Sequence, residues 1–358
     1  ADDVVWSMNR HIAEGSPSSI GAFFTLVEEW KAVDSHTVKL TLSSPDADMP
    51  FKLTQPQAKI VKKDNPLVSS GPYLVEEFQA GVKSNHVRNP NYWRDTGQHL
   101  DSIEVTAITD PNARLNALLA GSVDMIITPS AKMIKKIEES GNKVLSVPSG
   151  VYGGICCLKN TAPGDNDDLV QGLRYIQDRE RIVRTYLKGH GTLGNDHPIN
   201  ISYGADHCQE LPQIPYDPEK ARQLLKKAGL PNGLEIEISF KPGIHPRWIQ
   251  FQEALADQMA RAGIKVTLKR MSPGPFYNYR KSGKWHTYTQ EYGSYPVDPD
   301  VPLGDRLLAN PFKDNFSDKD IVKLIKQART TTNQDERVKL YRKAEVLMRE
   351  RGPFIPLV

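Results

Sequence analysis

Residues 216–240 read YDPEKARQLLKKAGLPNGLEIEISF, and these residues indicate the fold class. Asp217 is a favoured N-cap residue, Pro218 suits the first helical position, and Gly229 suits the position after the last turn. These signals predict a helix that begins at Pro218. The following LEIEISF alternates apolar and polar side chains, which predicts a strand. A helix that passes directly into a strand is typical of an α/β protein.

The same alternation of helices and strands continues on both sides of this stretch. Apolar residues recur at helical spacing between 169 and 187, and Gly263 separates another helix from the strand IKVTLKR. We therefore predict a second-half α/β unit with strands at 151–159, 234–240 and 264–270, helices at 169–187, 248–262, 318–330 and 335–350, and a strand-like run at 353–358.

The first half of the chain carries its own signals. Asp110 followed by Pro111 predicts the start of a helix, and Asp2 and Asp3 are expected to cap another. The predicted elements are helices at 2–14 and 111–119, and strands at 37–42, within 69–81 and 82–93, at 100–108 and at 123–127.

Length and composition narrow the class of protein. With 358 residues, the chain is long enough for two domains or one large elaborated domain. Its 39% apolar and 25% charged residues are typical of a globular protein. The net charge of +3 is too small to indicate a nucleic-acid partner, and no apolar run approaches the length of a membrane span. No low-complexity linker is visible, so we expect two packed lobes.

The three cysteines are Cys156, Cys157 and Cys208, an odd count that fits no complete disulfide framework. Neighbouring residues of a strand point to opposite faces, so Cys156 and Cys157 are expected on opposite sides of the predicted sheet. Either one pairs with Cys208, or all three are thiols with at least two of them buried. No C-x-x-C, H-E-x-x-H or zinc-like Cys/His spacing occurs, and we predict no metal site.

Residues 189–194, GHGTLG, match the G-x-G-x-x-G pattern of a dinucleotide-binding loop. A functional loop of this kind follows a strand and opens a helix, so that phosphates meet free N–H groups. Here the pattern follows the helix predicted at 169–187, and Gly189 suits the end of that helix. We therefore predict that this segment binds no nucleotide.

Several segments together resemble one family, the extracytoplasmic solute-binding proteins of ABC transporters, of the oligopeptide, dipeptide and nickel type (family 5). They occur in the family's order and run nearly from end to end of the chain. The segments are ADDVVWSMNR (1–10), SSGPYLVEEFQAGVKSNHVRNPNYW (69–93), LDSIEVTAITDPNARLNALLAGSVDMI (100–126), DRERIVRTYLKGHGT (178–192), YDPEKARQLLKKAGLPNGLEIEIS (216–239) and LADQMARAGIKV (255–266).

The resemblance implies an architecture. We expect the α/β, two-lobed periplasmic-binding-protein fold, class II-like with an enlarged first lobe, and lobes joined by two hinge strands. Residues 1–150 form the first lobe and 155–352 the second, with hinges near 149–154 and 353–356. By the family's pattern, the given chain lacks an N-terminal part of the first lobe, a C-terminal segment returning to it, and the signal peptide.

The resemblance also implies a function. We expect a non-catalytic, monomeric, periplasmic or lipid-anchored protein that captures a small solute in a cleft between the lobes. It delivers this solute to the permease subunits of an ABC importer, without a cofactor or nucleic acid. Two other classes stay open: a hydrolase, against which stands the lack of G-x-S-x-G, and a peptide-binding chaperone or signalling receptor. Turnover of a candidate ligand would favour the enzyme.

Two loops of the second half supply candidate ligand contacts. The segment KPGIHPRW follows a predicted strand and contains His245, Arg247 and Trp248. If Arg247 lies in the cleft, its guanidinium can bind a carboxylate of the ligand through two hydrogen bonds. The alternative is that Arg247 is an ordinary surface arginine. An aromatic stretch precedes the DPD segment at residues 298–300 and contains Tyr288, Tyr292 and Tyr295. These tyrosines either line the cleft, or alternate ones among them belong to the core.

One departure from the family bears on the cargo. Peptide-binding members capture the ligand's α-amino group with an aspartate, and the alignment on DPD places Tyr295 at that position. Asp298 is close but displaced. This favours an anionic or neutral small molecule, such as an opine, a sugar derivative or a metal chelate, over a short peptide.

The segment GNDHPI, residues 194–199, is the remaining candidate. Asn195, Asp196 and His197 either hold an Asx-type turn together or contact the ligand. Metal coordination by Asp196 and His197 alone is not expected, because a closed site needs about four ligands. Tyr152, beside the first expected hinge, completes the predicted ligand-binding residues.

Overall fold

The computed structural model describes the chain except residues 17, 19, 66, 67, 69, 148, 160, 161, 241–246, 283–286, 293–297, 306–317 and 357, and describes only the backbone of residues 22, 247–250, 280, 281, 287–292, 301 and 305. Two compact units make up the chain. The first contains Ala1–Pro129 and Lys135–Asn142, and the second contains Ser130–Ile134 and Lys143–Val358. None of the described helices is both long and apolar enough to cross a membrane.

The first unit begins with a small helix-and-hairpin core. Helix α1 (Asp2–Ile12), the short η1 (Gly21–Phe24) and α2 (Met49–Lys52) accompany the antiparallel strands β1 (Val27–Ala32) and β2 (Val38–Leu42). Met8, Phe24 and Trp30 are buried together, and the Phe24 and Trp30 rings meet edge to face at 6.1 Å. Burial of these side chains fixes the helix against the hairpin.

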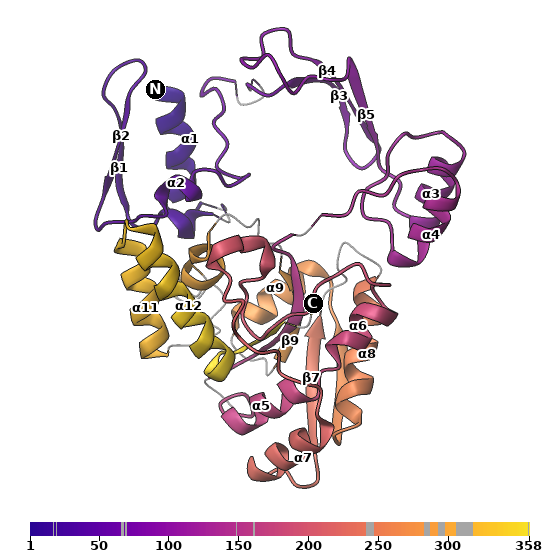
Figure 1. Cartoon of the computed structure of the whole chain (residues 1–358). Helices are drawn as coiled ribbons and strands as arrows, with labels where there is room; N and C mark the ends of the chain where they lie inside the picture. Colours follow the sequence, from indigo (N-terminus) through magenta and orange to yellow (C-terminus); the bar gives the residue numbers. More distant parts are fainter. Residues whose placement is uncertain are drawn as a thin grey trace. The chain divides into compact units, whose positions relative to one another are not determined.

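A three-stranded antiparallel sheet follows in the same unit (Figure 1). Its strands are β3 (Tyr73–Gln79), β4 (Lys83–Arg88) and β5 (Ser102–Thr106), and the helices α3 (Pro111–Leu119) and α4 (Ala131–Glu139) come next along the chain. The predicted start of α3 is confirmed, because Asp110 Oδ1 accepts a hydrogen bond from the Ala113 amide at 2.8 Å.

Two predictions for this unit are wrong. Ala1 is the N-cap of α1, and Asp3 instead accepts a hydrogen bond from the Lys63 amide at 2.7 Å. Residues 123–127 form no strand, and Met125 and Ile127 are 77% and 68% exposed. A strand needs a neighbour for its backbone groups, and among the described residues none pairs with this segment.

The second unit is built on a five-stranded mixed sheet with the order β10-β6-β9-β7-β8. Its strands are β6 (Tyr152–Cys157), β7 (Leu234–Phe240), β8 (Ile264–Arg270), β9 (Thr287–Tyr292) and β10 (Phe354–Pro356). The β10–β6 and β6–β9 pairs are antiparallel, whereas β7 runs parallel to both β8 and β9. The predicted strands at 234–240 and 264–270 are confirmed.

Helices cover both faces of this sheet, as Figure 1 shows. One face packs on α5 (Asp167–Tyr175), α7 (Pro218–Lys227) and α8 (Arg247–Ala260), and the other on α9 (Pro273–Lys281), α11 (Lys319–Thr330) and α12 (Gln334–Arg351). Two short segments complete this unit: η2 (Ile201–Asp206) precedes α7 in the sequence, and η3 (Val301–Asp305) precedes α11. Two helical layers around a largely buried sheet confirm the α/β class for this unit.

Strand β6 joins the two cores. The Cys157 side chain lies in the core of the α5, α7 and α8 face, and Cys156 lies in the core of the α11 and α12 face. The expected opposite orientation of these two residues is confirmed. All three cysteines are buried, and none of them forms a disulfide, so the pairing with Cys208 does not occur in the structure.

The helix predicted at 169–187 is broken into two. Helix α5 ends at Tyr175, and α6 (Arg179–Thr185) begins after Asp178, whose side chain accepts a hydrogen bond from the Arg181 amide at 2.9 Å. The apolar spacing continues across the break, which is why periodicity alone predicted one helix. Gly189 has φ of +86° and closes the turn beyond α6, with its amide donating to Val183 O at 3.0 Å.

Candidate functional site

A cavity of about 240 Å³ lies within the second unit, beside the start of β6. The loop after α6 forms much of its wall, and the end of the chain forms another part. Its lining consists of Val151, Tyr152, Thr192, Leu193, Gly194, Asn195, His197, Pro198, Ile199, Asn200, Ile201, His207, Leu211, Gln213, Pro356 and Val358. Apolar walls with a few polar side chains are typical of a small-molecule site.

Three of the predicted ligand-binding residues meet at this cavity: Tyr152, Asn195 and His197. The Asn195 amide nitrogen donates to Leu211 O at 3.0 Å, which ties two parts of the wall together. His197 is only 3% exposed and reaches the cavity from the loop. Ligand contact by these residues stays a prediction.

Asp196 lies behind the cavity wall and is fully buried. Its Oδ1 accepts a hydrogen bond from Arg179 Nη2 at 2.7 Å and lies 3.7 Å from Arg174 Nε. The backbone of Asp196 is left-handed, with φ of +61°, a conformation that aspartate tolerates better than most residues. This turn places the carboxylate inside the protein and the next residue, His197, against the cavity.

The two arginines connect this loop to the end of the chain. Arg174 donates to the carbonyl oxygens of Met348, Glu350 and Gly352 at the C-terminal end of α12. Arg179 Nε donates to Pro356 O at 3.3 Å. Burial lowers the pKa of the Arg174 guanidinium, and the nearby Asp196 opposes that shift. Asp196 therefore supports the loop electrostatically from within.

A second polar cluster touches the same wall. His197 Nδ1 lies 3.3 Å from Glu345 Oε2, and His207 Nδ1 lies 3.9 Å from the same oxygen. Burial lowers the pKa of His197 to about 3 and raises the pKa of Glu345 to about 9. At neutral pH these shifts leave an uncharged imidazole beside a protonated carboxyl group.

Asp298 has a different environment from the cavity residues. It is 2% exposed and forms a buried ion pair with Arg337 of α12. Nearby, Asp300 Oδ1 accepts a hydrogen bond from Arg329 Nε at 2.7 Å. Burial raises the pKa of Asp298, and its bond to Arg337 acts in the opposite direction. Its carboxylate therefore anchors α12.

The structure describes no side chain for the remaining five predicted site residues. His245 and Tyr295 fall outside the described residues. For Arg247, Trp248 and Tyr292 only the backbone is described: α8 begins at Arg247, and Tyr292 is the β9 partner of Tyr152.

Sequence reasoning missed His207 and Glu345. Glu345 carried a signal, because it shares the buried face of α12 with Tyr341 and Met348 at spacings of four and three residues. A carboxylate on an apolar helix face is unusual and indicates a specific partner.

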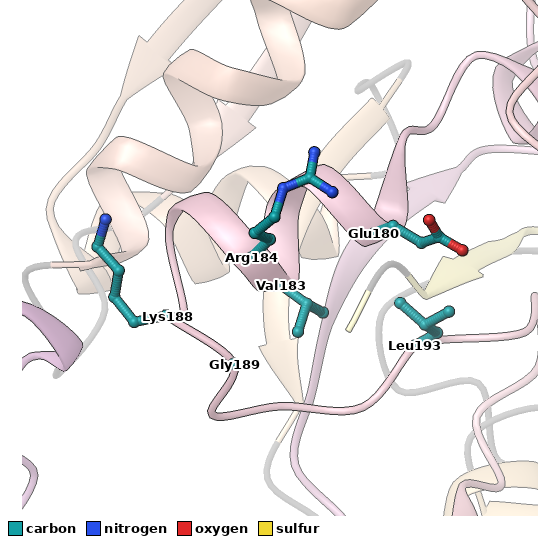
Figure 2. Close-up of a pocket in the computed structure, with 6 residues that line it drawn as sticks. All are labelled: Glu180, Val183, Arg184, Lys188, Gly189 and Leu193. Atoms are coloured by element: carbon teal, nitrogen blue, oxygen red, sulfur yellow. The ribbon is translucent and has the colours of Figure 1, made fainter.

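A larger, shallower pocket of about 490 Å³ lies at the end of α6 (Figure 2). Val183 and Leu193 supply its apolar surface, and Glu180, Arg184 and Lys188 carry charges around it. The glycine pattern at 189–194 therefore adjoins the C-terminal end of a helix, which carries partial negative charge. The pattern therefore does not open a helix, and the lack of nucleotide binding stays a prediction.

With this fold and these sites in view, comparison with known proteins gives the class of the protein. Residues 1–312 match the model of the bacterial extracellular solute-binding proteins, family 5 Middle, and the chain belongs to this family. The two-lobed α/β fold expected from the resemblance is the fold of its solved relatives.

Three relatives of known name match this chain over nearly its full length. It is 28% identical to heme-binding protein A of Haemophilus influenzae, covering 100% of this chain and 71% of that protein. The structure of the periplasmic binding protein DppA from Helicobacter pylori, in complex with the peptide STSA, matches with a TM-score of 0.86 at 20% identity, over 100% of this chain and 75% of that one. AgaA from A. tumefaciens, in complex with agropinic acid, matches with a TM-score of 0.83 at 24% identity, over 99% and 75%.

Proposed function

We propose that this protein captures a small solute outside the cytoplasm and delivers it to the permease subunits of an ABC importer, without catalysing a reaction. Family membership supports the role. The cavity at Tyr152, Asn195 and His197 is the single structural observation that carries it, since it offers a few placed polar groups among apolar walls.

The position of the cavity suits hinge closure. The two segments expected as hinges are neighbours in the sheet, where Pro356 of β10 faces Gly154 of β6. A cavity lined by Tyr152 and Pro356 therefore adjoins both segments. A solute that prefers the closed arrangement stabilises it by its differential affinity for the two states. The lobe boundaries and hinge positions remain part of this proposal.

For the cargo, we propose an anionic or neutral small molecule in place of a peptide held by its amino terminus. Tyr295, where an aspartate is expected, supports this choice. The relatives' names include both a peptide complex and an opine complex, so the family admits either class. Di- to pentapeptides should therefore not bind in the micromolar range in calorimetry. Binding of these peptides, with loss of binding on N-acetylation, would contradict the proposed cargo.

Native mass spectrometry of the purified full-length protein tests the role itself. We expect a co-purifying small molecule that dissociates on mild denaturation and rebinds unchanged. Incubation of the isolated molecule with the protein should return the same mass. A product of altered mass would support the hydrolase alternative and overturn the proposed transport role.

A further inference from the structure

Two imidazoles and one carboxylate converge inside the second unit. One ligand atom from each of His197, His207 and Glu345 lies within 4.8 Å of the others. The two imidazole rings have centroids 5.5 Å apart and planes inclined by 33°. These residues come from three separate places: the loop after α6, the end of η2, and the middle of α12.

Unsatisfied polar atoms point to a missing partner in this cluster. Three buried atoms of the cluster make no hydrogen bond to any described residue: both ring nitrogens of His197 and Oε1 of Glu345. The His197 and Glu345 side chains are only 1% and 0% exposed. Leaving such groups buried without partners is costly, and an ion or ordered water is the usual explanation.

The donor set matches a known coordination chemistry. Imidazole nitrogen and carboxylate oxygen are zinc ligands, and three protein ligands leave a fourth position for water or another small ligand. We propose that His197, His207 and Glu345 bind a divalent transition-metal ion of the zinc class. The fourth coordination position faces the cavity, because both histidines line it and Glu345 does not.

Neighbouring backbone groups hold two of the three ligands in place. The Cys208 amide donates to Glu345 Oε2 at 2.9 Å, and His207 Nδ1 lies 2.9 Å from Ile199 O. Carbonyl and amide groups that orient the ligands are a regular feature of metal sites. This proposal extends beyond the transport role and holds whichever solute the protein carries.

Metal titration of the untagged, full-length, chelator-treated protein tests the site. We expect saturable Zn²⁺ binding in calorimetry and, with Co²⁺, the intense visible absorption of four-coordinate cobalt. Glu345→Gln keeps the side-chain volume but removes the anionic ligand, and should weaken Zn²⁺ binding by at least about 100-fold, more than the loss of a supporting contact. His207→Ala should have a similar effect.

His190→Ala is the matched control, because His190 is an exposed histidine of the same loop. It should leave Zn²⁺ affinity and the cobalt spectrum unchanged. Equal affinity in the wild type, Glu345→Gln and His207→Ala would overturn the proposal. So would an octahedral cobalt spectrum or the lack of saturable binding in the wild type. These wild-type measurements decide the matter even if a variant fails to fold.

Discussion

At the residue scale, the pair of His197 and Glu345 gives the metal-free protein a distinctive pH dependence. From ordinary pKa values of 6.5 and 4.5, folding lowers that of His197 to about 3 and raises that of Glu345 to about 9. Between pH 4.5 and 6.5 the pair holds one proton in both the folded and the unfolded states. Its contribution to stability is therefore level in that window.

Outside this window the contribution falls in both directions. Above pH 6.5 only the folded state keeps the proton on Glu345, so stability drops as pH rises toward 9. Below pH 4.5 the unfolded state holds two protons, one on each side chain, whereas buried His197 keeps the folded state at one, so stability drops as pH falls toward 3. Each limb has a slope of up to about 1.4 kcal/mol per pH unit.

Urea unfolding in chelator between pH 6.5 and 8.5 measures the alkaline limb. We expect the free energy of unfolding of the wild type to fall relative to that of Glu345→Gln as pH rises, because the amide does not titrate. Parallel curves for the two proteins would show that Glu345 ionises normally.

The buried carboxylate of Asp196 gives a second prediction at this scale. Arg179→Ala leaves Asp196 without its 2.7 Å partner and should lower the free energy of unfolding by about 3 kcal/mol. Arg184→Ala, on the exposed side of the same helix, should change it by less than about 0.5 kcal/mol. Denaturant titration measures both. Adding Asp196→Ala to Arg179→Ala should recover part of the loss; no recovery would mean that the charge itself is not the cause.

Local residue signals were predictable, and distant pairings were not. Asp217 caps its helix as expected, accepting from the Lys220 amide at 2.8 Å, because capping involves residues adjacent in sequence. His197 and Glu345 instead meet through folding of α12 against the loop after α6. Periodicity says nothing about such a meeting, so the sequence offered His197 as a candidate without its partners.

At the element scale, a close backbone contact connects the residues just before the N-terminal ends of β7 and β8. Gly233 has φ of +85°, and an added Cβ would lie 1.9 Å from Gly263 O. Gly233→Ala should therefore cost about 3 kcal/mol or more, combining left-handed strain with displacement of a neighbouring strand.

Gly229→Ala is the control for this prediction. Gly229 has a similar φ of +82° but open space around it, so only the strain of about 1–2 kcal/mol should remain. Thermal or urea unfolding of both variants compares them. Equal losses would mean that the contact between Gly233 and Gly263 adds nothing.

Element boundaries depend on context beyond the local pattern. The predicted helix at 169–187 is interrupted because Asp178 caps a new helix, even though the apolar spacing continues. Residues 123–127 have a strand-like composition but no described strand beside them. The strands at 234–240 and 264–270 were better predicted because apolar and polar residues alternate along them, and each strand pairs with the other over its full length.

At the scale of the whole molecule, ligand binding tests the proposed role of Arg247. If this arginine forms a charge-assisted bidentate bond to an anionic solute, its loss removes about 1.5–3 kcal/mol of binding free energy. Arg247→Ala should then raise the dissociation constant for the co-purified solute by at least about tenfold. Arg247→Lys should recover only part, because an ammonium cannot form both bonds.

Calorimetry with the co-purified solute measures these constants. Arg261→Ala is the control, since Arg261 is exposed and lies just beyond the same helix, α8. It should leave affinity unchanged, and none of the variants should shift the melting temperature of the empty protein much. Unchanged affinity in Arg247→Ala would make Arg247 an ordinary surface residue.

Cys156 and Cys157 of strand β6 can report separately on the two helical layers that cover the sheet. One thiol samples the layer of α11 and α12, and its immediate neighbour samples the layer of α5, α7 and α8. Burial also raises the pKa of Cys157 to about 11, so that thiol stays unreactive while its layer is closed. Pulsed alkylation followed by peptide mapping would thus record, in one tryptic fragment, whether the two layers open together or in turn.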